Sequence, residues 1–316
     1  MRSVSVIIPT FNRAMKTARA VASVLYQTFA DYEIIVVDDG SQDATEEVMR
    51  QFGRRFRYIV HPHNRGVSAA RNRGIRESES PWIAFLDSDD YWLPTKLDAQ
   101  MAFFRNHPEA LICQTDEVWI RNGRFANPKK RHEKPSGEIF VPSLRLCLIS
   151  PSAVMLRRSL LEEVGLFDEN LPVCEDYDLW LRIACRHPVY LIQDRLIVKE
   201  GGHPDQLSSR YRGMDRFRIQ TILKVMESGH LNRAQRQAAL KELSLKCRIY
   251  GMGCIKRGKE EEGERYLRWA SGGAQPAVNS EPGAQRGSLL NAELGTRNAE
   301  LSAEGRSRES GGGSRG

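Results

Sequence analysis

The sequence lacks long apolar runs and paired cysteines. No hydrophobic stretch approaches the roughly 20 residues of a membrane-spanning helix. The apolar segment at residues 4–9 is too short for a signal peptide and contains Pro9. None of the 6 Cys forms a C-x-x-C pair, so we expect no zinc site and reduced thiols. These absences predict a cytoplasmic protein.

The sequence also lacks an internal repeat and a long basic tract. Its formal net charge is +7, but Lys and Arg are spread along the chain. This distribution is compatible with anionic partners such as nucleotides or an acidic lipid surface, and we expect no nucleic-acid partner. The basic segment 121–135 is interpreted either as a solvated loop or as a contact for an anionic acceptor or a membrane surface.

Strands and helices alternate in the N-terminal part of the chain. A short apolar run at residues 4–8 is stopped by Pro9, and Ala18, Val21 and Leu25 recur at the spacing of an amphipathic helix. Such alternation is typical of an α/β fold with a largely parallel sheet flanked by helices. We expect strands at residues 4–8, 33–37, 57–60 and 82–86, and helices at residues 15–28 and 66–77.

The composition changes twice toward the C-terminus. Residues 211–270 are helical in pattern and rich in charge, which predicts a helical appendage on a domain formed by residues 1–210. From residue 271 onward Gly, Ser, Ala, Arg, Asn and Glu dominate, with too few large apolar side chains to form a core. We therefore expect residues 271–316 to be a disordered tail.

Three carboxylates follow the apolar run at residues 82–86. Asp87, Asp89 and Asp90 repel one another unless cations lie between them. Because Asp87 and Asp89 are two positions apart, they share a face if the strand geometry continues. Carboxylate oxygens favour Mg²⁺ or Mn²⁺, which bind through one or two carboxylates and substrate phosphates. The alternative is an acidic turn that merely ends a strand.

Polar groups also follow two other predicted strands. Thr10 and Asn12 come after the first strand, and Asp38 and Asp39 end the second. Ligands of open α/β sheets bind outside the carboxyl ends of the strands. Together with the acidic residues 87–90, these groups predict one binding crevice.

A second acidic cluster contains Glu175, Asp176 and Asp178 and lies at the start of a predicted helix. It is interpreted either as catalytic or as negative charge that favours the positive end of the helix dipole. His203 lies in a polar, Gly-containing loop, where it is either a metal or phosphate contact or a solvated side chain. Neither feature identifies a chemistry when taken alone.

Five sequence motifs occur in order along the chain. They are VIIPTFNR (6–13), VVDDGSQD (36–43), GVSAARNRGI (66–75), FLDSDDYW (85–92) and EDYDLWLR (175–182). In this order the chain resembles family-2 glycosyltransferases with the Rossmann-like GT-A fold, over roughly residues 3–210. The C-terminal helices and the tail lie outside the resemblance.

The resemblance implies an enzyme that moves a sugar from a nucleotide-diphosphate sugar to a glycan or glycolipid acceptor, with inversion at the anomeric carbon. It implies a Mg²⁺ or Mn²⁺ cofactor and a role in bacterial-type synthesis of cell-surface glycans or glycolipids. The enzyme would then work in peripheral contact with the inner face of the membrane. The general base would be Asp176, and the metal ligands would be Asp87, Asp89 and His203. The nucleotide-sugar contacts would be Pro9, Thr10, Asn12, Asp39, Arg71, Asp87 and Ser88.

Two other interpretations remain at this point. A sugar nucleotidyltransferase of related fold would need a Gly-rich N-terminal phosphate loop, whereas this chain has Pro-Thr-Phe-Asn-Arg at residues 9–13. A non-catalytic sugar-nucleotide or glycan-binding protein could use the same fold. The joint presence of Asp87, Asp89 and Asp176 argues for catalysis, since metal-assisted displacement needs an acidic pair and a separate base.

Overall fold

The computed structural model describes residues 2–126, 133–202, 211 and 213–271. They belong to one compact unit that ends at residue 273. His203, part of the basic segment and all of the predicted tail except Ser271 lie outside the described residues.

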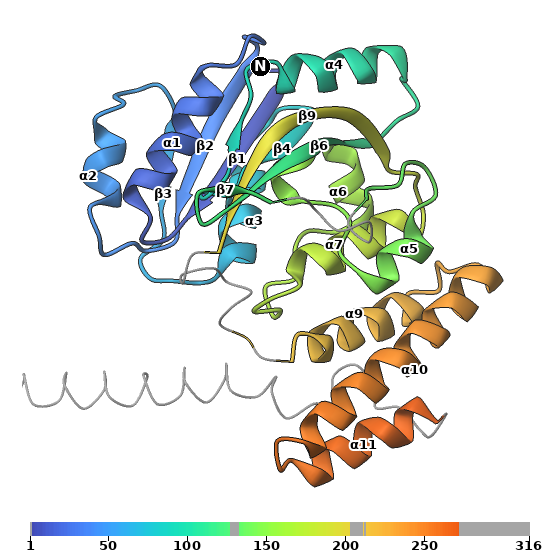
Figure 1. Cartoon of the computed structure of the whole chain (residues 1–316). Coiled ribbons are helices and arrows are strands. Elements are labelled where there is room, and N and C mark those ends of the chain that lie inside the picture. Colours follow the sequence, from blue (N-terminus) through green and yellow to red (C-terminus); the bar gives the residue numbers. More distant parts are fainter. Residues whose placement is uncertain (1, 127–132, 203–210, 212, 272–316) are drawn as a thin grey trace, which may run out of the picture. The chain divides into compact units, whose positions relative to one another are not determined.

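Four parallel strands form one half of the central sheet (Figure 1). β1 is buried at every position, because a parallel sheet is covered by helices on both faces. The strand order is β3-β2-β1-β4, which leaves the carboxyl ends of all four strands at one edge. These strands are β1 (Val4–Thr10), β2 (Tyr32–Asp38), β3 (Arg57–Val60) and β4 (Trp82–Phe85).

The other half of the sheet is mixed. β8 pairs antiparallel with both β4 and β6, whereas β6 and β9 run parallel with a register shift around Asp116. This half continues the order as β8-β6-β9-β5, with β7 paired to β6. Its strands are β5 (Tyr91–Trp92), β6 (Ile112–Arg121), β7 (Arg124–Phe125), β8 (Val154–Arg157) and β9 (Tyr190–Gly201).

Helices cover the sheet on both faces. α1 and α4 pack in one apolar cluster with β1, whereas α3 packs on the other face of the sheet. The approach of α3 is close, since a Cβ on Gly74 would lie 2.5 Å from Ile7 Cγ2. The helices here are α1 (Ala14–Leu25), α2 (Thr45–Arg50), α3 (Val67–Glu77), α4 (Lys96–Asn106), α5 (Phe140–Arg145), α6 (Arg158–Val164) and α7 (Glu175–Ala184), with a 3₁₀ turn at Pro151–Ala153. The predicted α/β fold class is confirmed.

Three further helices pack together beside α5 and α7 (Figure 1). They are α9 (Asp215–Glu227), α10 (Arg233–Ile255) and α11 (Glu260–Ala270). Asn232 and Gln235 form a capping box that starts α10. Lys246 Nζ donates to the Arg145 carbonyl at 3.2 Å and thereby fixes α10 to α5. The C-terminal helices are present as predicted, while the division into separate domains stays a prediction. Among the helices described, none is both long enough and apolar enough to cross a membrane.

Candidate active site

The ends of β1 and β2 lie side by side at one edge of the sheet. Thr10 is paired with Asp38 in the parallel register. Asn12 follows with a positive φ of 52°, a conformation that Asn tolerates better than most residues. Its N–H donates to Ser41 Oγ at 2.8 Å, and its side-chain oxygen accepts from the Gln42 N–H at 2.7 Å. The two loops that carry predicted nucleotide contacts are therefore tied together.

Asp39 is buried and holds the loop before α3. Its Oδ1 lies 2.7 Å from His61 Nδ1 and accepts from the Arg65 N–H at 2.9 Å. Its Oδ2 accepts from the Gly66 N–H at 2.7 Å. This arrangement gives Asp39 an anchoring role that the sequence did not reveal, and its predicted contact with the nucleoside stays a prediction.

The first two carboxylates after β4 each bind an arginine. Asp87 Oδ1 lies 2.6 Å from Arg71 Nη2, and Asp89 Oδ2 lies 2.9 Å from Arg13 Nη1. Arg13 comes from the end of the first motif but was not predicted as a site residue. Ser88, between the two carboxylates, is buried. Cations therefore relieve the repulsion within this cluster, as the acidic sequence required.

Asp90 differs from its two neighbours. It is buried, and its Oδ2 accepts from Ser152 Oγ at 2.6 Å while its Oδ1 accepts from the Glu200 N–H at 3.2 Å. Burial raises the pKa of Asp90 well above its ordinary value, and the nearby Lys199 charge opposes the rise. Asp90 thus ties β9 and the 3₁₀ turn before β8 to the end of β4.

Arg71 connects the two acidic clusters. Its Nη2 binds Asp87 and its Nη1 lies 2.7 Å from Glu175 Oε1, although the side chain is only 3% exposed. The guanidinium also lies 5.1 Å from the centre of the Phe167 ring. Burial alone would lower the pKa of Arg71, but Asp87 and Glu175 raise it above its ordinary value. The predicted site residue Arg71 is therefore a permanent cation between the two clusters.

Glu175 and Asp176 begin α7 in different surroundings. Glu175 is buried, and burial followed by the charge of Asp176 raises the pKa of Glu175 to about 7, against the opposing effect of Arg71. Asp176 is partly exposed; its Oδ1 accepts from the Tyr177 N–H at 2.7 Å, and its Oδ2 lies 3.6 Å from Cys147 Sγ. Asp176 therefore also satisfies a free N–H of the first helical turn, as the helix-dipole interpretation allows.

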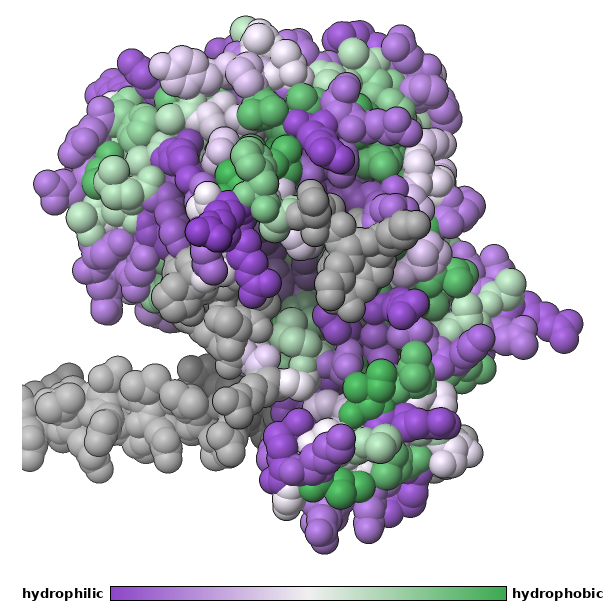
Figure 2. All heavy atoms as spheres, in the orientation of Figure 1, coloured by the Kyte–Doolittle hydropathy of each residue, from purple (hydrophilic) through white to green (hydrophobic). Residues whose placement is uncertain are grey.

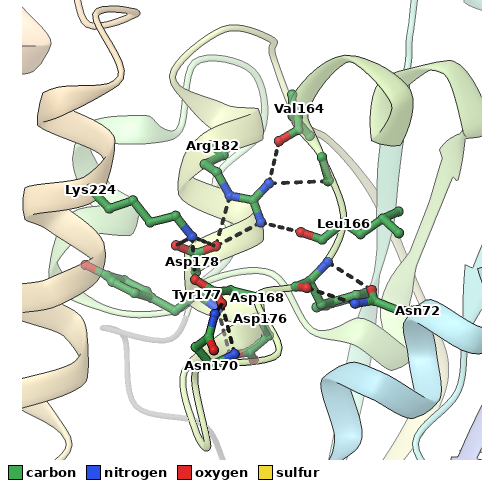
Figure 3. A network of polar contacts seen from close by, with 12 residues as sticks. Asn72, Val164, Leu166, Asp168, Asn170, Asp176, Tyr177, Asp178, Arg182 and Lys224 are labelled. Atoms are coloured by element: carbon green, nitrogen blue, oxygen red, sulfur yellow. Dashed lines mark hydrogen bonds and ion pairs between the residues drawn. The ribbon is translucent and has the colours of Figure 1, made fainter. Parts of the chain in front are cut away.

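A polar network holds α7 in place behind these residues (Figure 3). The Arg182 guanidinium donates to Asp178 at 2.8 and 2.9 Å and to the carbonyls of Val164 and Leu166 at 2.5 and 2.7 Å. Lys224 on α9 lies 3.2 Å from the same Asp178 carboxylate. Asp178 is completely buried, so this member of the second cluster belongs to the scaffold.

Lys199 on β9 is a site residue that the sequence reasoning missed. Burial alone would lower the pKa of Lys199, but the charges of Glu117, Asp90, Asp87 and Asp176 raise it above its ordinary value. The charge of Lys199 therefore interacts with carboxylates from both clusters, while its Nζ lies 5.8 Å from the centre of the Trp119 ring. The signal in the sequence was a single Lys directly after the apolar run at residues 196–198.

The residues present fit a divalent metal only in part. Asp87 and Asp89 offer the hard oxygen ligands that Mg²⁺ and Mn²⁺ use together with substrate phosphates. In the described ranges, no three His, Cys, Asp or Glu side chains are grouped so that they could hold a metal. The third predicted ligand, His203, lies outside those ranges. A metal at Asp87 and Asp89 would share these carboxylates with Arg71 and Arg13.

The family profile of "Glycosyl transferase family 2" matches residues 5–165. An uncharacterized glycosyltransferase of Rickettsia typhi is 32% identical over 65% of this chain and 66% of its own length, just under two thirds. The Escherichia coli protein WfgD, a "UDP-Glc:alpha-D-GlcNAc-diphosphoundecaprenol beta-1,3-glucosyltransferase", is 32% identical over 57% of this chain and 69% of its own length.

Solved structures show the same fold. Staphylococcus aureus TarS 1-349 in complex with UDP-GlcNAc has a TM-score of 0.64 at 18% identity, over 87% of this chain and 93% of that chain. The mannosyltransferase PcManGT of Pyrobaculum calidifontis, in complex with GDP-Man and Mn²⁺, has a TM-score of 0.59 at 16% identity, over 93% of this chain and 80% of that chain. The profile match and the shared architecture agree with the five motifs, and the chain therefore belongs to glycosyltransferase family 2, a family of transferases, and has the GT-A fold.

Proposed function

We propose that this protein is an inverting glycosyltransferase that moves a sugar from a nucleotide-diphosphate sugar to an acceptor hydroxyl. The observation that carries the proposal is the position of Arg71, which lies 2.6 Å from Asp87 and 2.7 Å from Glu175. This contact supports the proposal because it links Asp87 of the predicted metal-binding pair to Glu175, the neighbour of the predicted base Asp176, although the two clusters lie about ninety positions apart in the sequence. Displacement by an acceptor hydroxyl needs both.

The donor side consists of the sheet edge and the first acidic cluster. We assign the nucleotide sugar to Pro9, Thr10, Asn12, Asp39 and Ser88, with Arg71 toward the diphosphate. A Mg²⁺ or Mn²⁺ ion held by Asp87, Asp89 and His203 would supply positive charge to the diphosphate leaving group. The same edge in parallel α/β sheets is the usual place for a ligand, which supports this assignment.

The acceptor side consists of the second cluster. A bond forms between the acceptor oxygen and the anomeric carbon as the bond from that carbon to the phosphate oxygen breaks, and attack from the opposite face inverts the configuration. The acceptor proton passes to the Asp176 carboxylate, and the electron pair leaves with the nucleoside diphosphate. Glu175 binds Arg71 and Asp178 binds Arg182, which makes Asp176 the best base of the three.

We further propose that the acceptor is a glycan or glycolipid of bacterial-type cell-surface synthesis, and that the enzyme works in the cytoplasm in peripheral contact with the membrane. Two relatives support this class of acceptor. WfgD is named for a diphosphoundecaprenol-linked acceptor, and TuaG of Bacillus subtilis is named as a putative teichuronic acid biosynthesis glycosyltransferase.

The direct test is a thermal-shift screen of UDP-, GDP- and dTDP-sugars with and without Mn²⁺, followed by an assay of donor hydrolysis and transfer. A bound donor raises the melting temperature, since it binds the native state preferentially. We expect Mn²⁺-dependent stabilisation by one class of donor, and turnover of the same donor. Stabilisation without any turnover would instead indicate a sugar-nucleotide-binding protein.

A further inference from the structure

Helix α10 presents an exposed apolar stripe. Leu245, Ile249 and Met252 are 47%, 52% and 50% exposed, and their spacings of four and three place them on one face of the helix. Half of the large hydrophobic side chains exposed in the described part of the chain come from this one helix. The opposite face of α10 is buried through Ala239, Leu243, Lys246, Cys247, Tyr250, Gly251 and Cys254. The side chains of the stripe are therefore not the ones that pack α10 against the rest of the protein.

The exposed charged side chains beside this stripe are all positive. Lys241, Arg248 and Lys256 are exposed on the same side of α10, and none of the three forms an ion pair within the described residues. The helix has one acidic residue, Glu242, and it lies 3.2 Å from Lys246 on the buried side. Figure 2 shows hydrophobic atoms among hydrophilic ones on the surface of the C-terminal helices. The exposed face of α10 is therefore apolar at its centre and positive at its margins.

We propose that this face, formed by Lys241, Leu245, Arg248, Ile249, Met252 and Lys256, docks on an anionic lipid surface. Apolar side chains enter the headgroup region of a bilayer, while flanking Lys and Arg bind anionic headgroups. A second copy of this chain suits the face less well, because a twofold contact would place its like charges opposite one another. The proposal rests on the proposed function, since it supplies the contact through which a lipid-linked acceptor would be reached.

The test is sedimentation of the full chain with vesicles, without donor or metal. Vesicles of phosphatidylcholine alone are compared with vesicles that also contain phosphatidylglycerol. We expect binding only to the anionic vesicles and weaker binding at high salt. The variant Lys241→Gln/Arg248→Gln/Lys256→Gln should bind on the order of a hundredfold more weakly, and Leu245→Gln/Ile249→Gln/Met252→Gln about tenfold or more.

A control variant changes exposed apolar side chains elsewhere. Tyr26 and Val141 are 78% and 51% exposed, and Tyr26→Gln/Val141→Gln should bind vesicles like the wild type. Melting temperatures verify that all variants fold, and a donor thermal shift without vesicles tests the proposed function separately. The proposal would be overturned if the wild-type protein did not bind anionic vesicles, or if the α10 variants bound them as tightly as the wild type. So would light scattering that shows a dimer dissociated by the apolar variant, because the face would then join two copies.

Discussion

The two acidic clusters of the site have similar compositions but different neighbours. Each places three carboxylates within four residues, at positions 87–90 and 175–178. In each, one member belongs to the scaffold: Asp90 accepts from Ser152, and Asp178 binds Arg182. In each, another member binds the same cation, Arg71.

The remaining carboxylate of each cluster, Asp89 in the first and Asp176 in the second, shows how the clusters differ. Asp89 binds Arg13 at 2.9 Å, whereas Asp176 forms no ion pair with any residue that the structure describes. A carboxylate bound to a cation has part of its acceptor capacity occupied, while one without such a partner keeps lone pairs for a proton from another molecule. The comparison supports the proposal that the first cluster holds charge and that Asp176 in the second cluster accepts a proton.

The largest expected effect comes from the first cluster. Asp89→Asn removes a charged ligand from the predicted metal site, and kcat/KM for transfer should fall by on the order of a thousandfold or more. The measurement is turnover against Mn²⁺ concentration, with Asp194→Asn on the exposed part of β9 as a matched control. Unchanged turnover and an unchanged Mn²⁺ dependence in Asp89→Asn would contradict the prediction that Asp89 is a metal ligand.

The second cluster should respond differently. Asp176→Asn keeps the shape but cannot accept the proton, so kcat should fall by about 10²–10⁴-fold with the donor Kd nearly unchanged. If Asp176 only stabilises the helix start, the variant should instead lose about 1 kcal/mol or less and keep its turnover. Measuring kcat, donor Kd and melting temperature on one preparation separates these outcomes.

Glu175 should make stability depend on pH. Burial and the charge of Asp176 raise the pKa of Glu175 to about 7, so the folded state holds this proton more strongly than the unfolded chain. Protonated Glu175 therefore contributes fully to the free energy of unfolding below about pH 4.5. This contribution, of up to about 3 kcal/mol, is lost as the pH rises through about 7.

Urea unfolding of wild-type protein and Glu175→Gln at about pH 5 and about pH 8 measures this contribution. The wild type should lose stability relative to Glu175→Gln between the two conditions. Parallel pH dependence in the two proteins would show that Glu175 titrates in its ordinary range and that burial does not dominate at α7.

The smallest expected effect concerns Lys199, whose charge acts on carboxylates of both clusters. Lys199→Met makes the site more negative, so Mn²⁺ should bind more tightly and the metal-free donor more weakly, each by about tenfold. Lys199→Arg keeps the charge and is the matched control. Calorimetric titrations of metal and donor measure both affinities. Equal affinities in the Met and Arg variants would mean that Lys199 only packs against Trp119.

The parallel half of the sheet could be predicted from the sequence. The strands expected at residues 57–60 and 82–86 appear as Arg57–Val60 and Trp82–Phe85. The second is a continuous apolar run that is buried at every position, as in a strand covered on both faces, whereas the first lies at the edge of the sheet and is partly exposed. β9 was not predicted. The exposed residues 193–195 interrupt its apolar pattern at the place where its register with β6 shifts, so period-based reasoning fails there.

The residues of the candidate site were predicted more completely than their partners. Motif positions gave Arg71, both aspartates of the predicted metal pair and Asp176. Arg13, the partner of Asp89, was not identified although it is the last residue of the first motif. Lys199 was not identified either, although it lies close in sequence to the loop that contains His203. Sequence spacing says which residues share a strand end or a helix face, but it does not say which opposite charges meet.

The sequence by itself determined the alternation of strands and helices, the family and the two acidic clusters, because these depend on local periodicity and short motifs. Only the tertiary structure decided that Arg71 joins the clusters, although Glu175 lies 104 positions away from it in the chain, and that Asp90 and Asp178 are buried scaffold. The physical reason is that ion pairs and the pKa of a carboxyl group depend on distance in space and on burial, and a linear pattern contains neither.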